Sequence, residues 1–273
     1  PTRRSSDLTV TINPDGTVTY TPNEDYHGSD TITYTVSDGY GGTSESTVKV
    51  TVRPVQDAFN DADTTDEDTP VTLNVMDNDT FGPNAILTSV TQGKNGTVTF
   101  DKNGNVTYTP GDYFQSLADG ETATDTFTYT VTTAAGNTET ATVTITITGV
   151  NDAPIISVIA GDDDAKTIYE TDAALTTNGT LTLYDVDTSD TVTVSVVDSL
   201  TKGGTYTGAL PTDAELKAMF SASGGLTSTE QGKDHGISWG FDSGTHTFDT
   251  LATGETLILT YTVQVDDGKG GTV

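Results

Sequence analysis

The sequence contains no cysteine, few basic residues and no long apolar run. Without cysteine, disulfides and thiolate metal sites are excluded. Eleven lysines and arginines against 40 aspartates and glutamates give a net charge of −29. Such a field repels nucleic acid and anionic lipid and attracts divalent cations. No apolar segment approaches the roughly 20 residues of a membrane-spanning helix. We therefore expect no nucleic-acid partner and no membrane insertion in this segment.

The sequence contains internal repeats. The repeated phrases are GTVTYTP (16–22) and GNVTYTP (104–110), DTITYTV (30–36) and DTFTYTV (125–131), and VQDA (55–58) and VNDA (150–153). The first pair is separated by 88 positions and the others by 95, because residues 111–124 form a longer loop in the second copy. A period near 95 residues fits small independent domains rather than the units of a solenoid.

Alternation of apolar residues with threonine predicts antiparallel strands with one solvated face. Turn sequences such as Asn103-Gly104 separate short strands, and helix–strand alternation is absent, which is typical of a sandwich. For the complete middle domain the predicted strands are 61–67, 70–77, 85–92, 95–101, 104–109, 124–132 and 138–149. The fold class is therefore all-β: tandem antiparallel seven-strand Greek-key β-sandwiches of cadherin/Ig-like type. Tyr20, Tyr34, Tyr108 and Tyr129 lie in the apolar phase and are predicted core residues.

Four segments follow from these patterns. Residues 1–8 read PTRRSSDL, which a short-read sequencing adapter also encodes, and we interpret them as an artefact. Residues 9–55 are predicted to be the C-terminal half of a sandwich, and 56–150 a complete one. Residues 151–273 are predicted to form a third sandwich that lacks its last strand.

One helix is expected, in the third domain. It spans residues 212–220 (TDAELKAMF), where Thr212 and Glu215 form a capping box. Pro211 prevents the helix from extending upstream.

Acidic residues concentrate where the middle and third domains meet. The N-terminal end of the third sandwich offers Asp185, Asp187, Asp190, Asp266 and Asp267, the linker offers Asn151 and Asp152, and the C-terminal end of the middle sandwich offers Glu67, Asp119 and Glu121, with Asp68 and Asp125 as further candidates. Turn chemistry explains any single Asp-Gly pair. Convergence of three groups instead predicts calcium, which takes six to eight oxygen ligands. Magnesium, which prefers a tighter octahedral site, is disfavoured.

The junction between the first and middle domains is predicted to be a weaker site. It offers Asp57, Asp77 and Asp79, together with Gln56 and Asn78. Its facing loop, residues 133–137, has no carboxylate. We therefore expect fewer or weaker calcium ions here.

These phrases resemble known bacterial repeats. Residues 67–79 (EDTPVTLNVMDND), 95–110, 125–131 and 150–154 (VNDAP) are similar to cadherin-like and bacterial Ig-like repeats, and residues 179–187 and 239–271 are similar to the VCBS repeat. Such repeats form the extenders of large type I-secreted, RTX-type bacterial adhesins. The resemblance implies secretion, location at the bacterial cell surface, calcium-rigidified domain junctions and a role in adhesion and biofilm formation. The first linker departs from the pattern, with Gln56 for Asn and Phe59 for Pro.

The leading hypothesis is a non-catalytic extender. Its partners are calcium, the neighbouring repeats in the same chain, and surface glycans or proteins bound through domains outside this fragment. Nucleophile-elbow, zinc-protease and phosphate-loop motifs are absent, and the acids lie at domain ends rather than across a cleft. Two alternatives remain: a carbohydrate-binding module that uses Trp239 and the 201–236 insertion, and an accessory segment of a secreted polysaccharide-degrading enzyme.

Overall fold

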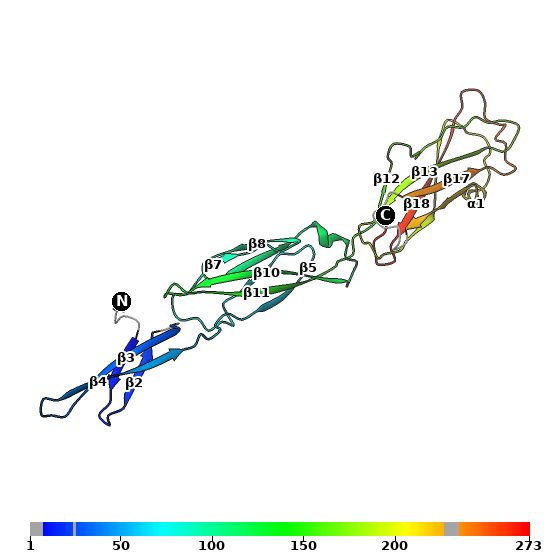
Figure 1. Ribbon diagram of the computed structural model, residues 1–273. Coiled ribbons are helices and arrows are strands. Elements are labelled where there is room, and N and C mark those ends of the chain that lie inside the picture. Colours follow the sequence, from blue (N-terminus) through cyan, green and yellow to red (C-terminus); the bar gives the residue numbers. More distant parts are fainter. Residues whose placement is uncertain (1–7, 24–25, 227–234) are drawn as a thin grey trace. The chain divides into compact units, whose positions relative to one another are not determined.

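The computed structural model describes residues 8–23, 26–226 and 235–273. The chain is all-β, with one α-helix and one short 3-10 segment among the described residues, as Figure 1 shows. Residues 1–7, most of the predicted artefact, and residues 227–234 of the 201–236 insertion lie outside the described residues. Within them, no helix is long and apolar enough to cross a membrane.

The middle sandwich has seven strands in two sheets, close to the predicted ranges and consistent with the Greek-key expectation. The four-stranded sheet has the order β5 (Asp61–Asp66), β11 (Thr138–Thr148), β10 (Thr122–Thr132) and β7 (Ile86–Val90), and the three-stranded sheet the order β6 (Val71–Asn74), β9 (Asn105–Pro110) and β8 (Gly96–Phe100). Figure 1 labels β5, β7, β8, β10 and β11. The 3-10 segment η1 (Asp112–Ser116) lies between β9 and β10.

The core of this sandwich follows the predicted alternation. Alternate residues of β10 and β11 are buried, and Tyr108 and Tyr129 are fully covered, as predicted. The Tyr108 hydroxyl donates to Asp125 at 2.9 Å, and the Asp125 carboxylate also accepts from the backbone N–H of Lys94 and of Asn95. Asp125 therefore closes the turn between β7 and β8 from inside. It does not belong to the acidic junction for which it was a candidate.

The third sandwich also has seven described strands. One sheet has the order β12 (Ile155–Ser157), β13 (Thr176–Tyr184), β17 (His235–Asp242) and β15 (Phe220–Ser223), and the other the order β16 (Gly225–Leu226), β14 (Val192–Gly204) and β18 (Leu257–Asp266). The predicted helix is present as α1 (Asp213–Ala218). Thr212 and Glu215 form the expected capping box at its start. The core between the sheets contains Leu183, Ile237 and Val265.

The described residues of the first repeat form two hairpins. The first pairs β1 (Leu8–Ile12) with β2 (Val18–Pro22), and the second pairs β3 (Gly28–Ser37) with β4 (Thr43–Val52). The prediction that Tyr34 is a core residue is wrong, because 42% of its surface is exposed. Its counterpart 95 positions on, Tyr129, is 0% exposed, since β7 pairs with β10 and a second sheet covers it.

The described residues divide into two compact units. One contains Asp66–Asp68, Gly111–Ala123 and Ile147–Val273, and the other contains the rest. The first of these joins the loops at the C-terminal end of the middle sandwich to the whole third sandwich. The predicted calcium ligands of the second junction all lie in this unit.

Candidate metal centre

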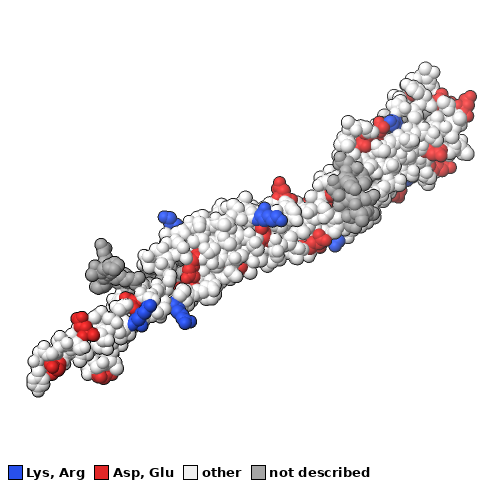
Figure 2. Space-filling view, viewed as in Figure 1, with Lys and Arg blue, Asp and Glu red and all other residues white. Residues whose placement is uncertain are grey.

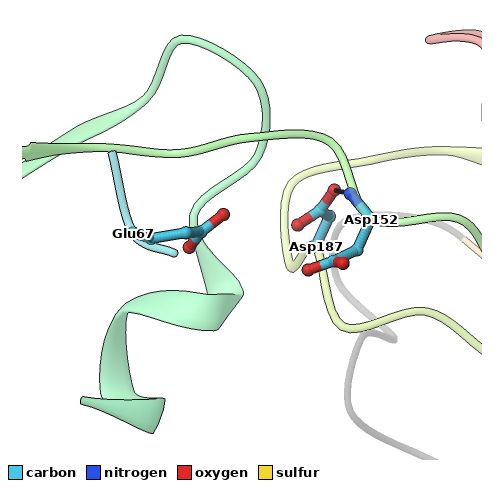
Figure 3. A group of neighbouring side chains, drawn as sticks. All are labelled: Glu67, Asp152 and Asp187. Carbon is cyan, nitrogen blue, oxygen red and sulfur yellow. Dashed lines mark hydrogen bonds between the residues drawn. The ribbon is translucent and has the colours of Figure 1, made fainter. Parts of the chain in front are cut away.

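Three carboxylates from separate parts of the sequence meet in this unit. Glu67 follows β5, Asp152 lies in the linker between β11 and β12, and Asp187 lies in the loop between β13 and β14. One oxygen of each lies within 4.8 Å of the others. Figure 3 shows Asp152 and Asp187 side by side, with the Glu67 side chain extending toward them from the other side. All three belong to the larger group of residues predicted for this junction, although they are up to 120 positions apart.

Backbone hydrogen bonds hold the three residues in place. The Glu67 N–H donates to the Thr148 carbonyl, and Glu67 Oε1 accepts from the Val150 N–H at 2.8 Å. Asp187 Oδ2 accepts from the Asp152 N–H at 2.8 Å, the dashed line in Figure 3. The linker backbone thus donates to one carboxylate oxygen of Glu67 and to one of Asp187. The second oxygen of each side chain takes no part in these bonds.

Those second oxygens are buried and have no hydrogen-bond partner. They include Glu67 Oε2 and Asp187 Oδ1, together with Asp185 Oδ2 from the same loop. Glu67 is 3% exposed, Asp185 1% and Asp187 0%. The Asn151 amide oxygen is buried and unpartnered in the same way. A buried carboxylate oxygen with neither hydrogen bond nor cation is strongly destabilising, so this arrangement suits a positive ion.

The carboxylates also repel one another. Burial raises the pKa of Asp187 to about 7; the Asp152 N–H opposes this effect, and the negative charges of Asp185 and Asp152 add to it. Burial is likewise the main cause of the raised pKa of Glu67 and of Asp185. Raised acid pKa values mean that the folded chain disfavours the charged forms, which a bound cation would reverse.

Two further predicted residues border this set. Asp267 Oδ2 accepts from the Asn151 side-chain amide at 3.1 Å, while its Oδ1 accepts from the backbone of Lys269 and Gly271. Asp190 is 5% exposed, and its pKa is raised by burial, lowered by Lys269 and raised by Asp267 and by Glu121. Both belong to the rim of the cluster.

Other predicted ligands lie on the surface. Asp266 is exposed and accepts the Gly268 N–H, which makes it part of the β18 turn. Asp119 and Glu121 are exposed, and Glu121 accepts from the Ala118 N–H. Asp68 accepts from the Gln115 side chain. The structure thus concentrates the predicted ligands on Glu67, Asp152, Asp185 and Asp187.

At the first junction the acids satisfy the backbone. Asp79 accepts from the Phe59 N–H at 2.7 Å and from the Tyr129 hydroxyl. Asp57 accepts from the Thr80 hydroxyl, and Asp77 is exposed. The Asp57 and Asp79 side chains are thus already hydrogen-bonded, and the weaker calcium site stays a prediction.

Sequence reasoning missed two acids at this junction. Glu139 accepts the N–H groups of Asp57 and Ala58, and burial beside Asp79 raises the pKa of Asp61 to about 6. Asp61 and Asp63 are two residues apart in β5 and therefore lie on the same face of the strand. This spacing was the available signal for an inward-facing acid.

Trp239, the residue considered for carbohydrate binding, is packed into the third sandwich. Its indole N–H donates to the Asp163 carbonyl at 2.7 Å, and its ring centroid is 5.9 Å from that of Phe220. A Cβ on Gly179 would lie 2.6 Å from the ring. These contacts favour the packing interpretation over a sugar-stacking platform.

Charge on the outer surface is dispersed. On the face shown in Figure 2, acidic and basic side chains stand singly or in small groups among uncharged residues. Of the acids that form the centre, Glu67 and Asp187 are instead buried and Asp152 is half-buried. The strongest accumulation of negative charge described above is therefore internal.

Comparison with solved structures gives similarities to tandem cadherin domains. The chain is 15% identical to the protocadherin gamma B7 extracellular cadherin domains 1–4, with a TM-score of 0.34, covering 96% of this chain and 65% of that one. It is 14% identical to the zebrafish RET cadherin-like domains 1 to 4, with a TM-score of 0.28, covering 97% of this chain and 63% of that one. The chain thus spans somewhat less than two thirds of these proteins, and the scores are too low to carry an argument about function.

Comparison with curated proteins gives no match. A family model described as "Bacterial Ig domain" matches residues 2–51 and 53–146, more than half of the chain. The two matched segments correspond to the first and middle repeats read from the sequence. The second segment, the middle repeat, folds as a two-sheet sandwich. This chain therefore belongs to the bacterial Ig domain family.

Proposed function

We propose that the chain is a non-catalytic extender segment of a secreted bacterial cell-surface adhesin, in which calcium rigidifies the junction between the middle and third repeats. The third repeat is of the VCBS type in this proposal. Calcium is held by Glu67, Asp152 and Asp187, with Asp185 and Asn151 completing the oxygen ligands. The segment supports adhesion and biofilm formation by holding a distal binding domain away from the cell.

The observation that carries the proposal is the set of buried oxygens without partners. Glu67 Oε2, Asp187 Oδ1, Asp185 Oδ2 and the Asn151 amide oxygen supply three negative charges and one neutral donor within a single unit. All are oxygens, the ligand type of calcium and magnesium. Membership of the bacterial Ig domain family agrees with an extracellular repeat.

The composition of the set favours calcium over magnesium. The carboxylates come from a strand end, a linker and a loop, and no single element arranges them in an octahedron. Calcium accepts six to eight ligands in flexible geometry, whereas magnesium requires near-ideal octahedral geometry and retains waters. Because the ligands come from two repeats, a bound ion links them directly.

Titration of the chelator-treated chain with calcium tests the proposal. We expect heat of binding by calorimetry and slower hydrogen exchange in Asp66–Asp68, in residues 150–153 and in residues 185–190. Magnesium at the same concentration, the matched control, should produce much smaller changes. A chain that binds no calcium and shows unchanged exchange in these three segments would contradict a metal-linked junction.

Calcium affinity is expected to fall as the pH is lowered from 7.5 to 5.5. At pH 5.5 an Asp187 with a pKa of about 7 is ionised in about one molecule in thirty, against about three in four at pH 7.5, so the apparent affinity should drop by about 25-fold. Without calcium, the stability of the fold is expected to depend on pH in the opposite direction. The folded chain binds more protons than the unfolded chain between about pH 4, the ordinary aspartate pKa, and about pH 7, so stability should rise as the pH falls across that window.

Calorimetry at the two pH values and denaturation in chelator measure these opposite trends. Equal calcium affinity at pH 7.5 and pH 5.5 would show that no ligand carboxylate has the raised pKa.

A further inference from the structure

The loop that distinguishes the middle repeat from the first has a structural role at this junction. Between the repeated phrases, residues 111–124 number 14, whereas the corresponding residues 23–29 number seven. The longer loop contains η1, and Phe114 of η1 is 0% exposed. The insertion therefore has a buried side chain of its own and an ordered backbone.

The anchored loop contacts the following repeat. The Ser116 carbonyl, at the end of η1, accepts from both the backbone N–H and the hydroxyl of Thr188, at 3.3 and 3.0 Å. Thr188 directly follows Asp187 in the loop between β13 and β14. The Gln115 side chain donates to Asp68, next to Glu67. The insertion thus touches the ligand-bearing segments of both repeats and uses no cation to do so.

The same loop closes over the linker at Gly149. The Gly149 N–H donates to the Glu121 carbonyl at 2.8 Å, and the Gly149 carbonyl accepts from the Gly120 N–H at 3.3 Å. A Cβ at position 149 would lie 2.2 Å from the Leu117 carbonyl oxygen and 2.4 Å from that of Ala118. These are backbone atoms, so any larger residue would force the loop away from the linker.

The first repeat differs from the middle repeat both in the linker residue and in the length of this loop. Offset by 95, the counterpart of Gly149 is Pro54, which is exposed, has no N–H to donate and follows the shorter loop. A linker proline and a short loop occur in one repeat, and a linker glycine and a long loop occur in the other. This pairing indicates that the close approach of the loop to the linker requires glycine at position 149.

We propose that residues 111–123 form a docking bracket for the following repeat, which Gly149 allows to close and which recognises the 185–190 loop through the Ser116 carbonyl. The partner that the bracket fits is a repeat whose loop between its second and third strands is Asp-x-Asp-Thr, a sequence present in the third repeat (185–188) and in the middle repeat (77–80). The first repeat, with Pro54 and the shorter loop, cannot present this surface. The bracket therefore determines which repeat can hold its successor by direct contact, separately from any ion at the junction.

Hydrogen exchange of the full chain in chelator tests the bracket. We expect Gly149→Ala to accelerate exchange by about tenfold in residues 111–123 and in residues 185–190, since two or more hydrogen bonds of ordinary strength are lost. Gly203→Ala is the matched control, because the nearest atom to its Cβ, on Ile258, would be at an ordinary 3.8 Å. The unfolding transition followed by Trp239, the only tryptophan, should stay unchanged.

A second variant removes the contact without disturbing the linker. Thr188→Val deletes the hydroxyl donor and should accelerate exchange in both segments by a smaller factor. Unchanged exchange of residues 185–190 in both variants would overturn the bracket. Protection in chelator together with absence of calcium binding would support the bracket while contradicting the proposed calcium function, so the two failures are distinguishable.

Discussion

Replacing Asp187 by asparagine is expected to stabilise the chain in chelator and to destabilise it in calcium. The asparagine side-chain oxygen can still accept the Asp152 N–H, so the backbone contact at 2.8 Å is retained. Without calcium the change removes a buried negative charge and its repulsion by Asp185, which should raise the free energy of unfolding at pH 7.5 by about 1–3 kcal/mol.

In saturating calcium the order of stabilities should reverse. At a thousandfold excess over its dissociation constant, calcium stabilises the parent chain by about 4 kcal/mol, and the variant loses most of this gain with a ligand charge missing. Denaturation followed by Trp239 fluorescence measures both values in the third repeat. Asp266→Asn is the matched control: the Asp266 side chain is exposed and accepts the Gly268 N–H of its own turn, so the stability should change in neither condition. The same order of stabilities in chelator and in calcium would contradict a calcium ligand at Asp187.

Replacing Asp125 by alanine is expected to destabilise the middle sandwich by about 3–5 kcal/mol. The Asp125 side chain, 4% exposed, accepts from the N–H groups of Lys94, Asn95 and Thr126 and from the Tyr108 hydroxyl. Burial by itself raises the Asp125 pKa, but these donors together hold it below its usual range. Alanine would leave several donors without partners, each costing about 1–3 kcal/mol.

Chemical denaturation followed by circular dichroism measures this loss, and the Trp239 transition of the third repeat should be unaffected. Asp101→Ala is the control, because Asp101 bonds its own exposed turn through Asn103 and Asn105 and should cost less than about 1 kcal/mol. A loss for Asp125→Ala no larger than that of the control would show that the buried donors find other partners. Because the Asp125 pKa is lowered on folding, its stabilising contribution should be lost as the pH falls through that pKa.

The strands could be predicted because alternation with a period of two directly indicates which residues face inward. Burial could not be predicted in the same way, because it depends on the covering strands. Tyr34 and Tyr129 occupy the same place in the repeated phrase, yet only Tyr129 has a neighbouring β7 and an opposing sheet. Local sequence determines the phase of a strand, and its distant partners determine what that phase encloses.

The candidate site was predictable to a similar degree. Alternation and loop order bring Glu67, Asp152 and Asp187 to one place, as expected. Which acids point inward depends on turn hydrogen bonds, and these keep Asp266 at the surface. The contact of Ser116 with Thr188 could not be anticipated, because it depends on a 3-10 segment in a loop without sequence periodicity.

The hydrogen bonds of the linker also determine where a pulling force would act. Tension transmitted along β11 reaches the third repeat through Gly149 and Val150, whose N–H groups are bonded to the Glu121 carbonyl and to the Glu67 carboxylate. Stretching the linker must break these bonds. An ion bound to Glu67 and Asp187 would share that load, so the resistance of the segment to flow would depend on the calcium concentration of the surrounding water.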